Sequence, residues 1–257
     1  MLSSSNIKLI NSLGYKKYRE RHGLFIIEGD RLVRELLESG KTVIKLFALP
    51  AWLDETDASL LALAREVIPV NERDLQKVSH LSTARSALAL VETEHHKPFI
   101  KSLSTSINIA LDNIQDPGNL GTIMRIAAWF GIENIICSKG STDVYNPKTV
   151  QASMGALLHV RVCYADLGSV LSSLSEKGIP VYAATLEGQA VYDADKSPEG
   201  MLLFGNETRG ISGELLPFVS HKISIPPAAE SRAGIDSLNV AMSAAIICNE
   251  FRRGEKK

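Results

Sequence analysis

The sequence lacks the features that would place the chain in a membrane or outside the cell. No apolar run approaches the roughly 18 residues that a membrane-spanning helix needs. The amino terminus has neither the basic start nor the apolar core of a secretion signal. Three cysteines, Cys137, Cys163 and Cys248, are odd in number and far apart, which fits neither a disulfide framework nor a metal site. We therefore expect reduced, buried cysteines, no metal and a cytoplasmic location.

Motifs for several common chemistries are also missing. No Gly-x-Gly-x-x-Gly follows an apolar segment, and there is no Walker phosphate-binding loop. Ser212 does not lie in the Gly-x-Ser-x-Gly elbow of hydrolases, and the six histidines show no metal-ligand spacing. These absences argue against a dinucleotide-binding Rossmann site, a P-loop enzyme, a serine hydrolase and a zinc enzyme.

The composition is that of a folded protein whose charge is unevenly distributed. Of 257 residues, 45% are hydrophobic and 22% charged, and the net charge of −1 argues against a generally basic nucleic-acid binder. The first 22 residues nevertheless carry a basic cluster opposed by Glu20 alone. The cluster, a candidate surface for RNA phosphates or simply a solvated helix face, consists of Lys8, Lys16, Lys17, Arg19 and Arg21.

Alternating strand-like and helix-like segments predict two α/β domains. A helix over residues 3–21 opens the first domain, which we place at residues 1–95. A polar linker over 96–106 precedes a second domain at 107–257. Short, nearly all-apolar strands in the second domain predict a mostly parallel sheet covered on both faces. Ligands of such sheets bind beyond the carboxyl ends of the strands, here the loops after residues 111, 185, 204 and 225.

The first candidate loop, Asp112 to Asn119, follows a predicted strand over Ile107–Leu111. Asn119 can cap the next helix, which we predict over Asn119–Phe130. Arg125 then lies less than two turns into that helix. It is either a solvated helix residue or a guanidinium that binds an anion, since its planar fork suits phosphate or carboxylate.

The second loop, Gly205 to Gly210, follows a predicted strand over Met201–Phe204. Gly205 allows another group to approach the backbone closely, and Gly210 suits a tight turn. Asn206 and Glu207 place an amide and a carboxylate at the ligand edge of the sheet. These two side chains serve either a ligand or the local backbone groups of the turn.

The third loop connects Ile225-Pro226-Pro227 to Ser237-Leu238-Asn239. Asp236 or Ser237 can cap the final helix, predicted over Asp236–Phe251. The free backbone amides at the start of a helix can hold a polar or anionic ligand. Ordinary capping of the helix is the other interpretation.

Taken together, the three loops resemble the three motifs of SpoU/TrmH-class methyltransferases of the SPOUT superfamily. The matching residues are Asn119 with Arg125, Gly-Asn-Glu-x-x-Gly at Gly205–Gly210, and Ile225-Pro226 followed by Ser237–Val240. The resemblance covers about residues 105–252, and the segment from Asn146 to Gly155 is also similar. The Glu28-Gly29 region resembles a small substrate-binding domain that often precedes this catalytic domain. Pro227 replaces the usual methionine, and Ala228–Ile235 make a longer loop than usual.

The resemblance implies an α/β fold whose carboxyl-terminal sheet has a trefoil-knotted topology, an exception to the rule against knots. It also implies a homodimer with the active site near the subunit interface. S-adenosylmethionine would be the cofactor, held largely by backbone groups of the knotted loops. The implied cofactor-binding residues are Thr185, Leu186, Gly205, Asn206, Gly210, Ile225, Pro226 and Leu238.

The implied reaction is methylation of a ribose 2′-hydroxyl in structured RNA, with ribosomal RNA favoured over transfer RNA. Our hypothesis is that Arg125 contacts the substrate phosphate and the 2′-oxygen and favours the alkoxide-like form of that oxygen. Arginine stays protonated, so its role would be electrostatic. The residues that would orient the 2′-oxygen and the ribose are Asn119, Glu207, Ser237 and Asn239.

Two other functions remain to be weighed against this one. A non-catalytic RNA-binding or ribosome-assembly factor could share the fold, although the retained Asn119, Arg125, Glu207 and Asn239 argue against it. A small-molecule nucleotide enzyme is disfavoured by the missing glycine-rich motifs.

Overall fold

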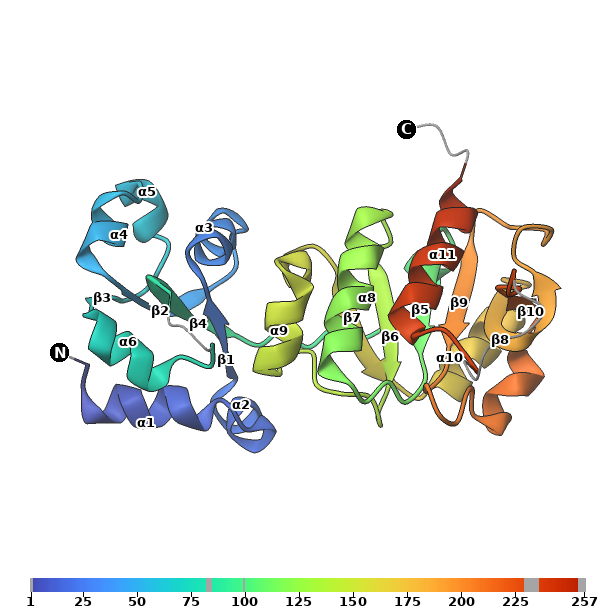
Figure 1. Ribbon diagram of the computed structural model, residues 1–257, viewed down its shortest axis with the longest axis horizontal. Helices are drawn as coiled ribbons and strands as arrows, with labels where there is room; N and C mark the ends of the chain where they lie inside the picture. Colours follow the sequence, from blue (N-terminus) through green and yellow to red (C-terminus); the bar gives the residue numbers. More distant parts are fainter. Residues whose placement is uncertain (1, 82–84, 99, 229–235, 254–257) are drawn as a thin grey trace. The chain divides into compact units, whose positions relative to one another are not determined.

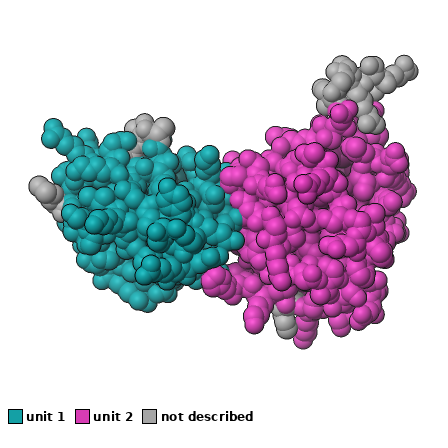
Figure 2. Space-filling model, turned by 90° about the horizontal axis from the view of Figure 1, so that it is seen from below, with its two compact units in different colours: residues 1–94, 143–158 teal, residues 95–142, 159–257 magenta. Residues whose placement is uncertain are grey.

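The computed structural model describes residues 2–81, 85–98, 100–228 and 236–253. The chain forms two compact units, shown in teal and magenta in Figure 2. Unit 1 comprises residues 1–94 and 143–158, and unit 2 comprises 95–142 and 159–257. The first crossing between units is adjacent to the predicted linker. The 143–158 segment comes from within the predicted second domain, and its packing with the first unit was not predicted.

Unit 1 is built on a four-stranded sheet of order β1-β4-β2-β3 (Figure 1). Strand β4 is antiparallel to both of its neighbours, and β2 and β3 are parallel. The strands are β1 (Leu24–Glu28), β2 (Val43–Ala48), β3 (Val67–Pro69) and β4 (Ala87–Glu92). The helices are α1 (Ser4–Ser12), α2 (Lys16–His22), α3 (Asp30–Glu38), α4 (Pro50–Asp54), α5 (Ala58–Leu61), α6 (Glu72–Val78) and α9 (Pro147–Ser153), with the 3₁₀ helix η1 (Ala156–Leu158).

The single helix predicted over residues 3–21 is wrong, because the chain breaks into α1 and α2. Leu13 is fully buried between the two helices, in the core that α1 and α6 share with the sheet. The break leaves the Leu13 carbonyl without a helical partner, and the Arg19 side chain donates a 2.8 Å hydrogen bond to it. A long polar side chain therefore satisfies a backbone group that a continuous helix would have satisfied by itself.

Unit 2 contains a six-stranded, all-parallel sheet of order β10-β8-β9-β5-β6-β7, which confirms the predicted α/β class. All five residues of β5 and of β9 are buried, as expected for strands covered on both faces. The strands are β5 (Ile107–Leu111), β6 (Asn134–Ser138), β7 (Arg161–Ala165), β8 (Val181–Ala190), β9 (Gly200–Phe204) and β10 (His221–Ser224). The helices are α7 (Ile100–Leu103), α8 (Pro117–Trp129), α10 (Leu167–Ser175) and α11 (Val240–Arg252), with the 3₁₀ helix η2 (Gly213–Phe218).

Helices cover both faces of this sheet. One face packs against α7, α10 and η2, through a core that includes Ala110 of β5 and Ile136 of β6. Helices α8 and α11 pack against each other and lie in front of the sheet in Figure 1. Asn119 in the first turn of α8 is joined by a hydrogen bond to Asn239, directly before α11, and Arg252 at the end of α11 reaches the Gly131 carbonyl just beyond α8. The two helices therefore run in the same direction, and both begin at the carboxyl edge of the sheet.

Strand β8 continues beyond residue 185, after which we expected a loop, and it contains an irregularity. Tyr182 and Ala183 pair with the first half of β10, whereas Gln189 and Ala190 pair with its second half. Residues 184–188 thus bulge out of the ladder between β8 and β10. A Cβ atom on Gly188 would lie 2.7 Å from the Lys222 carbonyl carbon, so glycine lets the strand rejoin the sheet there.

The three cysteines are free and buried, which confirms the expectation of reduced core residues. Burial raises the pKa of the Cys248 thiol to about 12, and it also raises the pKa of Cys137 and of Cys163 above the ordinary value. The thiolate is the reactive form of cysteine. These thiols are therefore protected in two ways, because they are buried and because they stay protonated.

We predict that none of the three cysteines reacts with a bulky thiol reagent at pH 8 while the protein is folded, and that all three react after unfolding in denaturant. Mass spectrometry of the labelled chain measures this. Because the folded-state pKa values are raised, the thiols contribute stability below pH 9 that is lost as the pH rises further. Labelling of the folded chain at the rate of a free thiol would contradict the prediction.

Candidate functional site

The first two candidate loops start side by side because β5 and β9 are adjacent and parallel. Leu111 pairs with Phe204, so the loops that follow these residues leave the same edge of the sheet. The Asp112 amide donates to the Phe204 carbonyl at 2.9 Å and continues the ladder by one residue. This geometry confirms that the carboxyl edge of the parallel sheet brings the two loops together.

Asp112 joins the first loop to the end of the second, and the sequence analysis did not identify this role. Its carboxylate is 3% exposed and accepts the Ser212 amide and the Asn113 side-chain amide, both at 2.8 Å. An acidic residue directly after a mostly apolar, fully buried strand is the signal that could have revealed it, since a buried carboxylate requires hydrogen-bond donors. Asp112 is therefore a structural organiser of the loop pair.

The second loop is a tight turn organised by Asn206 and two glycines. The Asn206 side-chain oxygen accepts the Thr208 and Arg209 amides, and its amide group donates to the Asn113 carbonyl at 2.9 Å. A Cβ atom on Gly205 would lie 2.3 Å from the Gly210 carbonyl carbon, so the group that approaches Gly205 belongs to the loop itself. Gly210 has φ +69°, as a tight turn requires. Glu207, between these residues, projects from the loop and is exposed.

Helix α8 begins two residues earlier than predicted, and its cap is not Asn119. Asp116 caps the helix by accepting the Asn119 backbone amide at 2.8 Å, and Pro117 occupies the first helical position. The predicted role of Asn119 as the cap is therefore wrong. Because Asp116 caps the helix, the Asn119 side chain is available for contacts outside α8.

The Asn119 side chain connects all three loops. Its amide nitrogen donates to Glu207 Oε1 at 2.5 Å, and its oxygen accepts the Asn239 amide nitrogen at 3.0 Å. Glu207 lies 88 residues after Asn119 in the chain, and Asn239 lies 120 residues after it. Asn239 thus donates to Asn119, and Asn119 donates to Glu207. This sequence of bonds fixes the orientation of each amide and directs one oxygen of Glu207 toward Asn119.

Asn239 also caps α11, which begins four residues later than predicted. Its side-chain oxygen accepts the Ala241 amide at 2.9 Å and the Met242 amide at 3.4 Å. The prediction that Asp236 or Ser237 caps this helix is therefore wrong. Ser237 is exposed in the irregular segment before the helix. The unusual loop from Ala228 to Ile235 lies outside the described residues, apart from Ala228 itself.

Arg125 lies on α8 two turns beyond its start and is exposed. Among the residues that the structure describes, it has no hydrogen-bond or ion-pair partner. An unpaired guanidinium on the helix that also presents Asn119 is available to a phosphate or a carboxylate. Five residues were predicted to act on the substrate, and the structure brings three of them, Asn119, Glu207 and Asn239, into direct contact.

The residues predicted to hold the cofactor lie around the ends of β8, β9 and β10. Thr185 and Leu186 lie in the bulge of β8, where the Thr185 hydroxyl donates to the Glu187 carbonyl at 2.6 Å. Leu186 is 63% exposed and Leu238, just before α11, is 48% exposed. Ile225 and Pro226 follow β10 directly. The exposed Leu186, within β8, and Leu238, just before α11, supply apolar surface for a flat aromatic ligand, and the loops after β9 and β10 supply backbone hydrogen-bonding groups.

The basic residues predicted to contact RNA lie on α1 and α2 of unit 1. The side chains of Lys8, Lys16, Lys17 and Arg21 are exposed. Arg19 is different, because its side chain is 3% exposed and forms an ion pair with Asp143 at 2.6 Å. A guanidinium that is buried and paired is not available to an RNA phosphate, so the prediction of a direct RNA contact is wrong for Arg19.

No helix in the described part of the chain is both long and apolar enough to cross a membrane. The same residues contain no group of three or more histidine, cysteine or acidic side chains that could hold a metal ion.

Comparison with known proteins identifies the same two regions. The model of the SpoU rRNA Methylase family matches residues 106–249, and that of the MRM3-like substrate binding domain matches residues 4–89. The chain is 30% identical over 251 residues to the 23S rRNA (guanosine(2553)-2′-O)-methyltransferase RlmP of Bacillus subtilis, covering 97% of this chain and 96% of that protein.

Solved structures extend this similarity to the fold. A putative RNA methyltransferase of the TrmH family from Porphyromonas gingivalis has a TM-score of 0.86 at 37% identity, over 98% of this chain and 99% of that one. An rRNA methyltransferase from Sinorhizobium meliloti, crystallised with S-adenosylmethionine (AdoMet), has a TM-score of 0.87 at 28% identity, over 100% and 98% of the two chains. This chain therefore belongs to the SpoU rRNA methylase family and carries an MRM3-like substrate-binding domain ahead of the catalytic domain.

Proposed function

We propose that this protein transfers a methyl group from S-adenosylmethionine to a ribose 2′-hydroxyl in ribosomal RNA. The observation that carries the proposal is that hydrogen bonds join Asn119, Glu207 and Asn239 at the carboxyl edge of the sheet. Asn119 lies on α8, the helix that also presents Arg125. Relatives that match this chain over 96% and 73% of their own lengths support ribosomal RNA as the substrate, because RlmP and rRNA methyltransferase 3 of Xenopus laevis are both named for it.

The residues at the cofactor edge fit S-adenosylmethionine. Leu186 and Leu238 offer exposed apolar side chains for the adenine ring. The backbone groups beside them belong to Thr185, Gly205 and Ile225, each directly after or within a strand that ends at this edge. Asn206 and Gly210 keep the second loop in its turn and so act on the cofactor indirectly. When bound, S-adenosylmethionine supplies an electrophilic methyl carbon attached to a sulfonium sulfur.

The chain's own residues hold the ribose and ease the loss of a weakly acidic proton from its hydroxyl. Arg125 binds the phosphate beside the ribose and stabilises negative charge on the 2′-oxygen, while its guanidinium stays protonated. Asn119 and Asn239, with amides fixed by their mutual hydrogen bond, orient the sugar. Glu207 has a second carboxylate oxygen that can accept a proton or a hydroxyl hydrogen bond, and Ser237 adds a hydroxyl next to Asn239. Positioning of this kind supplies much of the rate enhancement.

RNA is held by unit 1 through phosphate and shape contacts. Lys8, Lys16, Lys17 and Arg21 form the exposed basic face of α1 and α2, and Arg19 supports α2 from the inside. Reduced cysteines and a ribosomal RNA substrate support a cytoplasmic location. A non-catalytic assembly factor would not need the Asn119–Glu207–Asn239 arrangement, so the methyltransferase is the better supported of the two functions.

The polypeptide after β10 is threaded through a trefoil knot. Support comes from the position of β10 at the edge of the sheet beside β8, whereas α11 returns to pack against α8 near the middle of the sheet. Residues 229–235 connect these positions and lie outside the described range. An electron-density map of the cofactor complex that traced this connection around the outside of the other loops would disprove the knot.

The functional molecule is a homodimer in which α8 and α11 contact a second copy of the chain. Trp129 near the end of α8 is 84% exposed, and Met242 near the start of α11 is 58% exposed. A tryptophan buries about 150–250 Å² when covered, so leaving it in water forgoes a large stabilisation. Since α8 and α11 both carry site residues, such an interface lies beside the active site.

We predict that Arg125→Ala lowers the rate of methyl transfer to ribosomal RNA roughly 100- to 1,000-fold, as expected when one charge-stabilising donor is lost. The rate is measured with labelled S-adenosylmethionine, followed by nuclease digestion and identification of the 2′-O-methyl nucleoside. Cofactor affinity, measured separately by calorimetry, stays near that of the wild type. Arg65→Ala, an exposed arginine of unit 1 paired with Glu92 at 3.3 Å, is the matched control and retains full activity.

Near-normal turnover of Arg125→Ala disproves the role of Arg125. If the wild-type protein neither binds S-adenosylmethionine nor methylates ribosomal RNA, that result favours the function of a non-catalytic assembly factor.

We predict that Trp129→Glu converts the protein from dimer to monomer at micromolar concentration, because a charge replaces the apolar centre of the interface. Light scattering coupled to size exclusion gives the mass. Leu63→Glu, a 51% exposed leucine of unit 1, is the control and leaves the mass unchanged. A monomeric wild type, or a dimeric Trp129→Glu variant, rules out this interface.

A further inference from the structure

The 143–158 segment belongs to one domain by sequence and to the other by packing. It lies between β6 and β7, inside the 106–249 range that matches the SpoU rRNA Methylase family. Its contacts nevertheless group it with residues 1–94, and its helix α9 packs against β1. The MRM3-like substrate binding domain matches residues 4–89 only, so this segment is an addition to that unit.

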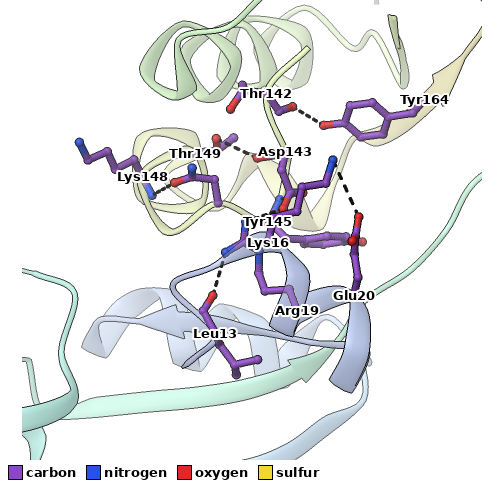
Figure 3. Close-up of polar contacts among 11 residues, drawn as sticks. Leu13, Lys16, Arg19, Glu20, Thr142, Asp143, Tyr145, Lys148, Thr149 and Tyr164 are labelled. Atoms are coloured by element: carbon purple, nitrogen blue, oxygen red, sulfur yellow. Dashed lines mark hydrogen bonds and ion pairs between the residues drawn. The ribbon is translucent and has the colours of Figure 1, made fainter. Parts of the chain in front are cut away.

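A buried ion pair holds the start of the segment against α2 (Figure 3). Arg19 Nε and Nη2 both donate to Asp143 Oδ2, at 3.0 and 2.6 Å, while Nη1 donates to the Leu13 carbonyl. Asp143 Oδ1 accepts the Tyr145 amide at 3.0 Å, and the Thr149 hydroxyl donates to the Asp143 carbonyl at 3.2 Å. Every polar group of this pair thus has a partner, as a buried charge requires.

Tyr145 makes a second attachment. Its ring lies 4.4 Å from the ring of Phe25 in β1, measured between centroids. Its hydroxyl donates to the Glu94 carbonyl at 2.7 Å and accepts the Glu94 amide at 2.8 Å. On α9, Thr149, Val150 and Ser153 are buried. One side of the segment is therefore fixed to the substrate-binding unit by apolar, aromatic and polar contacts.

The opposite side of the segment is exposed. Lys148 and Gln151, three residues apart on α9, are exposed, and Met154 follows with 69% of its surface exposed. Met154 has φ +47°, a left-handed conformation that glycine adopts more easily at the end of a helix. An apolar side chain in a strained, exposed position points to a function rather than to stability. The segment's only acid is Asp143, which Arg19 neutralises.

We infer that residues 143–158 form a second RNA-contacting element of unit 1, and that the Arg19–Asp143 pair positions it next to the basic face of α2. In Figure 3, Lys148 and Lys16 lie on either side of this pair. Lys148 contacts an RNA phosphate, and the flexible side chain of Met154 packs against an unstacked base. The inference rests on the proposed function, since it requires that unit 1 binds RNA.

The test compares RNA affinity of full-length variants at several salt concentrations, using ribosomal RNA as the probe. Lys148→Ala should weaken binding and reduce the slope of log affinity against log salt by about one, the loss of one phosphate contact. Met154→Gly should weaken binding several-fold without lowering the unfolding temperature, because glycine relieves the strained backbone. Affinity for S-adenosylmethionine, a property of unit 2, should not change in either variant.

The Asp143→Asn variant distinguishes a positioning role of Asp143 from a purely electrostatic one, because the two roles predict opposite changes in RNA affinity. Removal of a negative charge beside an RNA-binding surface should tighten RNA binding if charge alone matters. Loss of a positioning residue should weaken it several-fold. Glu20→Gln is the matched control, because it removes the same charge from the exposed Lys16–Glu20 pair, and it should bind RNA at least as tightly as the wild type.

Unchanged affinity and salt slope in both Lys148→Ala and Met154→Gly overturn the inference, even if Asp143→Asn fails to fold. Tighter binding by a folded Asp143→Asn overturns the positioning role. If the wild type itself does not bind ribosomal RNA, the proposed function fails together with the inference. If the wild type binds and methylates RNA while the variants behave identically, only the inference fails.

Discussion

The candidate site depends on one side chain, Asn119, that hydrogen-bonds to two loops distant in the sequence. It accepts from Asn239 and donates to Glu207, so a single amide sets the positions of a cap residue and a carboxylate. Each such bond contributes only about 0.5–1.5 kcal/mol to stability, and less where water competes. Burial of the apolar side chains of β5 and β9 contributes far more. The bonds of Asn119 therefore determine orientation in the site, while the sheet determines that the site forms.

The sheet brings these loops together because all of its strands are parallel. Parallel order places every carboxyl end at one edge, and the pairing of Leu111 with Phe204 starts two of the loops at the same level. Buried Asp112 then joins the loops, and Asp116 caps α8 so that Asn119 is not needed there. Asp112 and Asp116 have no proposed part in the chemistry. Asp112 positions the loops, and Asp116 leaves the Asn119 side chain available for the site.

Most of the fold could be predicted because its signals are local. The mostly apolar segment Ile107–Leu111 was predicted with the bounds that β5 has, and the positions of the three loops followed from the parallel order of the strands. The cap of α8 was missed although Asp116 followed by Pro117 is a local signal for a helix start. The cap of α11 was missed because Asp236, Ser237 and Asn239 are all residue types that can cap a helix. The role of Arg19 was missed because its partner, Asp143, lies 124 residues away. The 143–158 segment packs with unit 1 through pairings that no local pattern in the sequence indicates.

We propose that the arrangement around Asn119 and Arg125 serves methylation of ribosomal RNA. The most direct test maps 2′-O-methyl groups on ribosomal RNA from cells that contain the protein, cells that lack it, and cells that contain only the Arg125→Ala variant. We expect that a ribose methylated in the first cells is unmethylated in the other two. Identical maps in all three, or a methyl group restored by Arg125→Ala, would contradict it.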